Sequence, residues 1–248
     1  MSDARDRPPA SSFERGLRVL IAICDRDQVR VDDLVSQLGL PASTVYRYLR
    51  PLRELGLVRE ADGYYRVGSR LGGDGRGVSN ETLALLARPI LAELARETGE
   101  TALLTIRIGS HALCLDQVQS QHPVRMAFEV GQVLPLPAGA ASRVLLAYAP
   151  AEVVERVLGE QLPAHTSATP DARKLRRQLE STRTLGYTAS RAEFIPGAYA
   201  IAAPVFHGEE AAAGLALAGP ANRCTHAWQL TARPLLIDAA RRLSEQLS

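Results

Sequence analysis

A cluster of glycines near residue 75 divides the chain into two parts of unequal length. Four glycines fall within six residues of the stretch RLGGDGRGVSN, which runs from Arg70 to Asn80. Glycine adopts backbone conformations that other residues avoid, so clustered glycines mark a break between regular elements. The chain has 248 residues, which is enough for two domains. We therefore expect a smaller N-terminal domain and a larger C-terminal one.

The domain bounds follow from the position of this break. Residues 1–12 are polar and contain two adjacent prolines, which predicts a disordered N-terminal tail. The first domain is expected over residues 13–71 and the second over residues 99–248. Residues 72–98 are expected to hold a linker and a linker helix.

Bulk properties argue against several protein classes. The chain contains no run of eighteen apolar residues and no apolar N-terminal segment, so we expect neither a membrane span nor a secretory signal, and a cytoplasmic location. Three cysteines, Cys24, Cys114 and Cys224, lie too far apart for a metal-ligand motif. We expect buried structural thiols, and neither a metal nor a cofactor. The net charge is only +2, so any binding of nucleic acid must depend on local placement of charge.

Helical periodicity is strong in the first domain. Apolar residues recur at helical spacing over residues 13–24 and again over 31–38, after which Gly39 predicts a tight turn. The segment ASTVYRYLRPLRELG then places Val45 and Leu49 on one face of a third helix. Two helices joined by a glycine turn make a helix-turn-helix.

A short hairpin is predicted directly after the third helix. In LVREADGYYRVG, strand-like stretches at 57–58 and 64–67 flank Asp62-Gly63, a pair typical of a tight hairpin turn. Three helices followed by such a hairpin make a winged helix-turn-helix.

The third helix carries the residue types of a DNA-recognition helix. Residues 41–70 hold six arginines and three acidic residues. Hydroxyls and amides at the start of the helix can hold phosphates, while arginine and tyrosine can reach bases. The candidate residues are Ser43, Thr44, Tyr46, Arg47 and Arg50. A generic helical hairpin with solvated arginines would show the same periodicity, so these features alone leave both interpretations open.

A proline interrupts the pattern of this helix. Pro51 lacks a backbone donor and clashes with the preceding turn, which costs about 3 kcal/mol in an undistorted helix interior. We therefore expect a kink or an early change of helix geometry near Arg50.

The second domain shows an α+β pattern. An amphipathic helix is expected over 82–98, and Gly109-Ser110 separates the first two expected strands as in a hairpin. Further helices are expected near 140–148, 151–158 and 171–185 and from Thr225, and strands at 101–108, 112–118, 124–130, 187–191, 199–206 and 212–218.

Seven sequence segments, taken in their order along the chain, are typical of one protein family. The first domain contains ERGLRVL, LVSQLGLPASTVYRYLRPLRELGLV and GYYRVGSRL. The second contains ARPILAELARETGETALL, HPVRMAFEVGQVLPL, EFIPGAYAIAAPV and AGLALAGP. In these segments the chain resembles the IclR family of bacterial transcription regulators, from residue 13 onward. The resemblance implies a winged domain with the candidate residues above on its recognition helix and Asp62-Gly63 at the wing tip. It also implies a GAF-like effector domain with an antiparallel sheet and flanking helices.

The resemblance places an effector between the sheet and the helix that begins near Gly139. Met126 and Leu134 match apolar walls of the family's pocket, and Ala140 and Ala141 match residues that offer backbone amides. Helix N-terminal amides suit a carboxylate or carbonyl oxygen.

Four other pocket positions differ from the polar pattern of the family. Ser190 stands where an aspartate is frequent, Ala200 where a cysteine is common, and Ala216 and Ala218 where serines are common. An apolar wall leaves the groups of a small oxygenated acid unpaired, at a cost of about 1–3 kcal/mol each. We therefore expect a larger, mainly apolar effector, aromatic or acyl, whose acid or carbonyl end, if present, meets the amides of residues 139–142. Alternatively, the alanines pack closely and the pocket is small or empty.

Two other functions compete with a ligand-responsive regulator. An enzyme would need a nucleophile, a base and an orienting group together, whereas the histidines are scattered, so we expect no catalytic residues. The alternative is a DNA-binding dimer whose second domain only oligomerises. The family implies a homodimer or a dimer of dimers on a palindromic operator, with repression the commoner outcome. The expected mechanism is a population shift that the 80–98 helix transmits.

Overall fold

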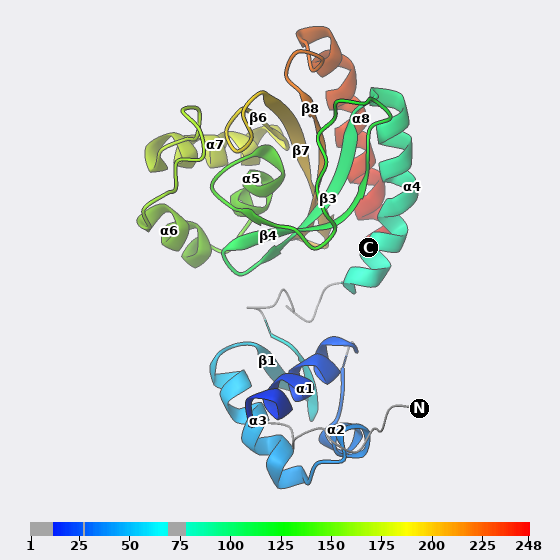
Figure 1. Ribbon diagram of the computed structural model, residues 1–248, viewed down its shortest axis with the longest axis vertical. Coiled ribbons are helices and arrows are strands. Elements are labelled where there is room, and N and C mark those ends of the chain that lie inside the picture. Colours follow the sequence, from blue (N-terminus) through cyan, green and yellow to red (C-terminus); the bar gives the residue numbers. More distant parts are fainter. Residues whose placement is uncertain (1–11, 27, 69–77) are drawn as a thin grey trace, which may run out of the picture. The chain divides into compact units, whose positions relative to one another are not determined.

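The computed structural model describes residues 12–26, 28–68 and 78–248 (Figure 1). The chain forms two compact units that divide between Gly77 and Val78. The expected tail, apart from Ser12, and the linker residues up to Gly77 lie outside the described residues.

The first unit is a winged helix-turn-helix, as the sequence predicts. Its helices pack around a small apolar core that includes Ile23, Leu34 and Leu49, all almost fully buried. Strands β1 and β2 pair in antiparallel fashion, with Ala61 opposite Tyr64. The elements are α1 (Ser12–Cys24), α2 (Val31–Leu38), α3 (Ala42–Glu54), β1 (Val58–Ala61) and β2 (Tyr64–Val67).

Two glycine-containing turns define this unit. Gly39 ends α2 in the left-handed conformation, with φ of 63°, and α3 begins three residues later at Ala42. Asp62 and Gly63 form the hairpin turn with φ of 55° and 77°, the backbone that a two-residue hairpin of this type needs. Pro51 does not end α3, which continues to Glu54.

The second unit is built on a six-stranded antiparallel sheet with the order β5-β4-β3-β8-β7-β6. Long hairpins supply most of it, since β3 pairs with β4 and β7 pairs with β8. The strands are β3 (Thr101–Ile108), β4 (His111–Val118), β5 (Val133–Pro135), β6 (Thr188–Arg191), β7 (Ala198–His207) and β8 (Glu210–Pro220). The helices are α4 (Asn80–Thr98), α5 (Ala140–Ala147), α6 (Ala151–Gly159), α7 (Ala172–Leu185) and α8 (His226–Leu247).

The sheet separates two apolar cores. Helices α4 and α8 cover one face, and α5, flanked by α6 and α7, covers the other (Figure 1). Side chains alternate between the faces along β8, because Leu215 and Leu217 pack in the core with α4 and α8 while Ala216 and Ala218 pack in the core with α5. Gly214 lets α5 approach closely, since a Cβ there would lie 2.7 Å from the Val144 side chain.

The predicted strand over 124–130 is wrong. Residues 119–132 instead form an irregular connection between β4 and β5, which we call the strap, and β5 itself was not predicted. The alternating apolar residues that suggested a strand do share one side of the strap, since Met126 and Phe128 both line a pocket. The Met126 carbonyl and the Phe128 amide bond to side chains rather than to a neighbouring strand.

The cysteines divide into two classes. Cys114 and Cys224 are buried free thiols, as expected, whereas Cys24 at the end of α1 is exposed, so that part of the prediction is wrong. No described helix is both long and apolar enough to cross a bilayer.

Candidate functional site

The N-terminus of α3 presents hydrogen-bond donors to solvent. Its N-cap is Pro41, which has no side-chain acceptor. The amides of Thr44 and Val45 donate to the Pro41 carbonyl at 2.9 and 3.1 Å. Within the described part of the chain, the amide and hydroxyl of exposed Ser43 have no hydrogen-bond partner. This helix end can therefore hold a phosphate.

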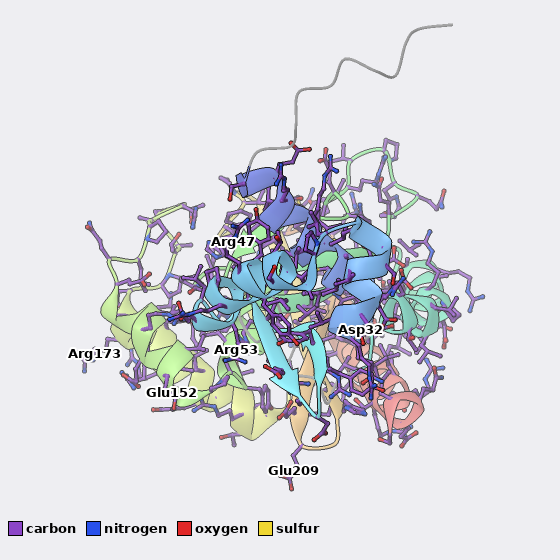
Figure 2. All side chains as sticks on the ribbon, turned by 90° about the horizontal axis from the view of Figure 1, so that it is seen from below. Asp32, Arg47, Arg53, Glu152, Arg173 and Glu209 are labelled. Carbon is purple, nitrogen blue, oxygen red and sulfur yellow. The ribbon has the colours of Figure 1, made fainter. Side chains whose placement is uncertain are left out.

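Tyr46, Arg47 and Arg50 follow on the exposed side of α3. Tyr46 is 53% exposed, which is high for an aromatic ring. The Arg47 guanidinium lies 5.3 Å from the Tyr48 ring centre (Figure 2 labels Arg47). Arg50 Nε donates to Glu54 Oε1 at 3.0 Å. An exposed pair of this kind contributes less than about 1 kcal/mol, so Arg50 can exchange Glu54 for a phosphate.

The wing is held against α3 by an ion pair that sequence reasoning missed. Asp62 and Gly63 are exposed at the tip of the β1–β2 hairpin. Arg53 of α3 pairs with Glu60 of β1, joining the helix to the wing. Neither helical nor strand periodicity connects these two positions, so the sequence carries no signal for the pair.

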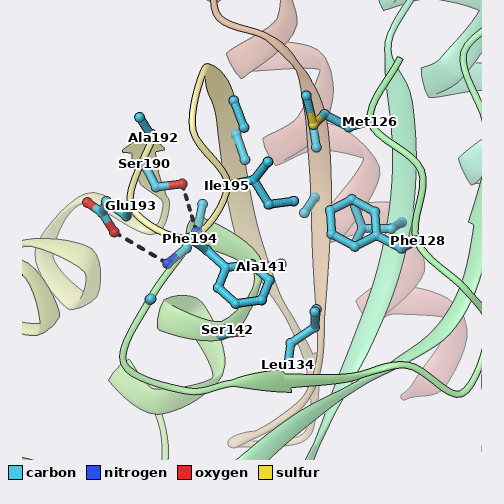
Figure 3. Close-up of a pocket in the computed structure, with 18 residues that line it drawn as sticks. Met126, Phe128, Leu134, Ala141, Ser142, Ser190, Ala192, Glu193, Phe194 and Ile195 are labelled. Atoms are coloured by element: carbon cyan, nitrogen blue, oxygen red, sulfur yellow. Dashed lines mark hydrogen bonds between the residues drawn. The ribbon is translucent and has the colours of Figure 1, made fainter. Parts of the chain in front are cut away.

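A pocket opens between α5 and the sheet face that α5 covers (Figure 3). The cavity proper is small, about 50 Å³, and the hollow around it measures about 520 Å³ when the space open to solvent is included. The wall contains every position that the sequence suggested for an effector: Met126, Leu134, Ala140, Ala141, Ser190, Ala200, Ala216 and Ala218. The alanines thus line a small pocket.

Several wall residues were missed from the sequence. Phe128 comes from the strap, and Glu193, Phe194 and Ile195 come from the loop between β6 and β7 (Figure 3). The Phe194 ring meets the His165 ring edge-on, with centres 4.9 Å apart. Three of these residues begin the motif EFIPGAYAIAAPV. They lie in a loop, so strand periodicity does not identify them, but apolar side chains in a loop are themselves a sign of a buried wall.

The N-terminus of α5 is only partly available to a ligand. Gly139 is the N-cap and has no side chain, and its amide donates to Glu193 Oε2 at 3.3 Å. The Ala140 amide donates to Ser190 Oγ at 3.0 Å. Among the described residues, no acceptor lies in hydrogen-bonding position for the amides of Ala141 and Ser142. In this structure Ser190 thus takes the Ala140 amide, and the amides without an acceptor among the described residues belong to the next two residues, Ala141 and Ser142.

A buried ion pair lies behind this helix end. Arg143 and Glu193 have side chains that are 1% and 6% exposed, and they bond directly. Arg143 Nη1 also donates to the Ala189 carbonyl at 2.8 Å and to Thr188 Oγ1 at 3.2 Å. Burial lowers the pKa of the Arg143 guanidinium, and the charge of Glu193 opposes that change. The pair ties the β6–β7 loop to α5.

Hydrogen bonds link the strap region to α4 in the middle of the helix, at Arg88, and at its C-cap Gly99, which accepts from Ser120 Oγ. Thr101 Oγ1 donates to the Met126 carbonyl at 2.5 Å and accepts from the Ser120 amide at 3.1 Å. Gln117 accepts from the Phe128 amide at 3.1 Å. Arg88 of α4 donates to the Gln117 carbonyl at 2.9 Å. Two wall residues of the pocket thus connect to α4 through short chains of hydrogen bonds.

The described residues contain no group of three or more His, Cys, Asp or Glu side chains that could hold a metal ion. His207 lies opposite Glu210 in the register of the β7–β8 hairpin.

Comparison with known proteins assigns both units. The IclR helix-turn-helix domain model matches residues 12–62. The model for the bacterial transcriptional regulator IclR C-terminal domain matches residues 76–245.

Individual relatives agree with these matches. The HTH-type transcriptional regulator KipR of Bacillus subtilis is 30% identical over 85% of this chain and 86% of its own. The transcriptional repressor IclR of Escherichia coli is 32% identical over 86% of this chain and 81% of its own. The crystal structure of an IclR homolog from Microbacterium hydrocarbonoxydans, complexed with 4-hydroxybenzoate, is 27% identical. It covers 96% of this chain and 99% of its own, with a TM-score of 0.65.

Proposed function

The chain belongs to the IclR family of bacterial transcriptional regulators, and we propose on that premise that it is a repressor whose operator affinity responds to a small, mainly apolar effector. It is a DNA-binding regulator and not an enzyme, since its relatives are transcriptional regulators. The observation that carries the effector proposal is the apolar pocket at the N-terminus of α5. A cytoplasmic location is part of the proposal.

The DNA-contacting surface is the exposed side of α3 together with the wing. Ser43 and Thr44 would hold backbone phosphates through hydroxyls and amides, which fixes the register of the helix. Tyr46, Arg47 and Arg50 would reach base edges or further phosphates. The Asp62-Gly63 tip would lie beside the neighbouring groove.

The protein is proposed to act as a homodimer or a dimer of dimers. A single winged domain spans only a few base pairs, whereas two copies related by a twofold axis match a palindrome. Relatives named as repressors support the direction of regulation.

The proposed effector is aromatic or acyl. Aromatic and aliphatic side chains form most of the pocket wall, including Phe128, Phe194 and Leu134, which suits an apolar ligand body. The complex of a relative with 4-hydroxybenzoate supports a ligand of this general kind.

The proposed coupling passes through the strap. A ligand that displaces Met126 or Phe128 would alter the hydrogen bonds to Thr101 and Gln117, and with them the position of α4. α4 is the first element after the glycine-rich break that joins it to the DNA-binding unit. A shift of α4 would therefore change the positions that the DNA-binding unit can adopt on the operator. A ligand shifts α4 only if it binds the protein more tightly in the shifted conformation than in the unshifted one.

The proposal is tested by selecting an operator from random DNA with the purified protein and then measuring its affinity by fluorescence anisotropy. A panel of aromatic and acyl compounds is added to find those that weaken operator binding. Ala218→Leu fills the pocket and should abolish the response while DNA binding persists; Ala189→Leu, at an exposed site of β6, is the matched control. An equal response in Ala218→Leu and wild type would rule out this pocket as the effector site.

A further inference from the structure

A group of basic and aromatic side chains lies at the edge of the sheet, on the face opposite the pocket. β6 is an edge strand, and Arg191 at its end stands directly opposite Tyr199 of β7. Their neighbours Ser190 and Ala200 line the pocket, so Arg191 and Tyr199 face the other side, where α8 packs on β7. This group is therefore separate from the effector pocket.

Each arginine of this group is held against a tyrosine ring. The Arg191 guanidinium lies 5.1 Å from the centre of the Tyr199 ring. The Arg233 guanidinium of α8 lies 5.4 Å from the centre of the Tyr187 ring, and its Nη1 donates to the Tyr187 hydroxyl at 3.1 Å. Cation–π contacts orient a guanidinium over the ring, so both charges are positioned in advance. We call these four residues the Arg–Tyr cluster.

The two halves of the Arg–Tyr cluster meet at the Tyr199 hydroxyl. Tyr199 is 7% exposed, and burial raises the pKa of its phenol, while the charges of Arg191 and Arg233 oppose that change. The Tyr187 phenol acts on the same group. Both guanidiniums therefore lie close enough to influence one hydroxyl, since such effects fall off with distance.

No carboxylate offsets the two positive charges in the part of the chain that the structure describes. Neither Arg191 nor Arg233 forms an ion pair with a described residue, although both are exposed. Glu100, which packs against β8 beside the cluster, bonds Arg223 through both of its oxygens. Asp238 of α8 pairs with two other arginines of that helix. The Arg–Tyr cluster is therefore a local excess of positive charge with unused donors.

These donors match a phosphate group better than a carboxylate. Guanidiniums bind both kinds of oxyanion through paired N–H groups, and one guanidinium is enough for the two oxygens of a carboxylate. Arg191 belongs to a strand and Arg233 to a helix, so their N–H groups approach from two different elements. A phosphate monoester offers three oxygens and a charge close to −2 at neutral pH. Two guanidiniums balance that charge and bind different oxygens.

We propose a second ligand site that binds a dianionic phosphate group, carried by inorganic phosphate or by a phosphate monoester. Its binding groups are the guanidiniums of Arg191 and Arg233 and the hydroxyls of Tyr187 and Tyr199. The Tyr187 hydroxyl accepts from Arg233, which leaves its own proton free to donate to the phosphate. The site does not rest on the effector pocket, because the two lie on opposite faces of the sheet.

Trp228 provides a readout, because it is the only tryptophan of the chain and its ring meets the Tyr199 ring edge-on, with centres 6.2 Å apart. The protein is titrated with inorganic phosphate and with phenyl phosphate at about pH 7.5, and sodium chloride holds the ionic strength constant. Tryptophan fluorescence should change in a saturable way, with half-saturation below about 5 mM. Calorimetry repeats the titration without the fluorophore, and acetate should bind at least about tenfold more weakly.

The two phosphates distinguish the sources of the ligand. Tighter binding of phenyl phosphate indicates a phosphate monoester, and tighter binding of inorganic phosphate indicates the free ion. No saturable binding of either compound by fluorescence and calorimetry would overturn the inference, as would equal binding of acetate.

Variants locate the binding. Arg191→Gln and Arg233→Gln should each weaken phosphate binding at least about tenfold. Tyr187→Phe keeps the ring and removes the hydroxyl, so it should weaken binding about threefold. Arg173→Gln, at an exposed position of α7, removes an equal charge elsewhere and should bind as the wild type does (Figure 2). Wild-type affinity in both Arg191→Gln and Arg233→Gln, or an equal loss in Arg173→Gln, would overturn the site.

Discussion

Thr101 Oγ1 donates a hydrogen bond of 2.5 Å to the carbonyl oxygen of Met126, so the first residue of β3 holds a wall of the pocket in place. The same hydroxyl accepts from the Ser120 amide, and Ser120 Oγ donates to the carbonyl of Gly99, the C-cap of α4. The strap therefore bonds the C-cap of α4 directly through Ser120, and the fully buried Thr101 side chain joins Ser120 to Met126.

Thr101→Val tests this relationship, because valine keeps the shape and removes both hydrogen bonds. The change should lower the free energy of unfolding by about 1–3 kcal/mol, since buried polar groups are left unpaired. The weakening of operator binding by an aromatic compound from the panel should shrink, while operator affinity without the compound changes little. Thr231→Val, at an exposed position on α8, is the matched control. An unchanged response in Thr101→Val would show that the strap does not transmit ligand binding.

The Arg143–Glu193 pair should dominate the local stability of the pocket. Removing one partner leaves the other buried and unpaired, so Arg143→Met should cost about 3–5 kcal/mol. The double variant with Glu193→Gln should recover much of that loss, because no buried charge then lacks a partner. Denaturant unfolding of the wild type, both single variants and the double variant measures the coupling. Additive losses would show that the two side chains stabilise the protein independently.

Arg47 and Ser43 should differ in how they affect DNA binding. If Arg47 contacts a base, Arg47→Ala should weaken operator binding by about 1–3 kcal/mol and should reduce the base preference at one operator position. Ser43→Ala removes a phosphate donor and should weaken all sequences alike. Binding to a set of single-base operator variants distinguishes the two patterns, and Arg177→Ala on α7 controls for the loss of a positive charge. A uniform loss with Arg47→Ala would reassign that side chain to the phosphate backbone.

The three thiols should label at very different rates. Burial raises the pKa of the Cys114 thiol to about 11, so at pH 8 only about one molecule in a thousand carries the thiolate there. Cys224 is likewise buried, with its pKa raised to about 12, whereas Cys24 is exposed. A maleimide should therefore modify one cysteine in native protein and three in denaturant, as mass spectrometry would show. Rapid native labelling of Cys114 would contradict the burial described here.

These thiols also predict how stability changes with alkaline pH. A thiol whose pKa is raised on folding stays neutral in the native state while the unfolded chain ionises. The contribution of Cys114 is therefore complete below about pH 9 and falls as the pH rises toward about 11. Cys114→Ala should reduce this alkaline loss in the free energy of unfolding, and an unchanged pH profile would exclude the thiol as its source.

The fold was largely predictable because its elements follow simple periodicities. Gly39, the Asp62-Gly63 turn and the alternation along β8 each produce a pattern that sequence alone reveals. The strap was mispredicted because Met126 and Phe128 alternate as in a strand, while their backbone bonds to side chains from distant positions. Periodicity describes which side a residue faces but not what its main chain binds.

The pocket was predictable in outline and not in its chemistry. Resemblance to a family located the alanine wall, since aligned positions keep their place in the fold. It did not reveal that Ser190 and Glu193 use two of the amides at the start of α5. Such contacts join residues about fifty positions apart, and only the folded arrangement brings them together.

The coupling between the pocket and the operator is tested most directly by measuring operator affinity as the pocket fills. The selected operator is titrated by fluorescence anisotropy, with and without a saturating aromatic compound from the panel, while calorimetry follows binding of that compound to the protein. The compound should weaken operator binding by about tenfold, a coupling typical of such regulators, and Ala218→Leu should abolish the effect. A compound that binds the wild type in calorimetry and leaves its operator affinity unchanged would contradict an effector-responsive repressor.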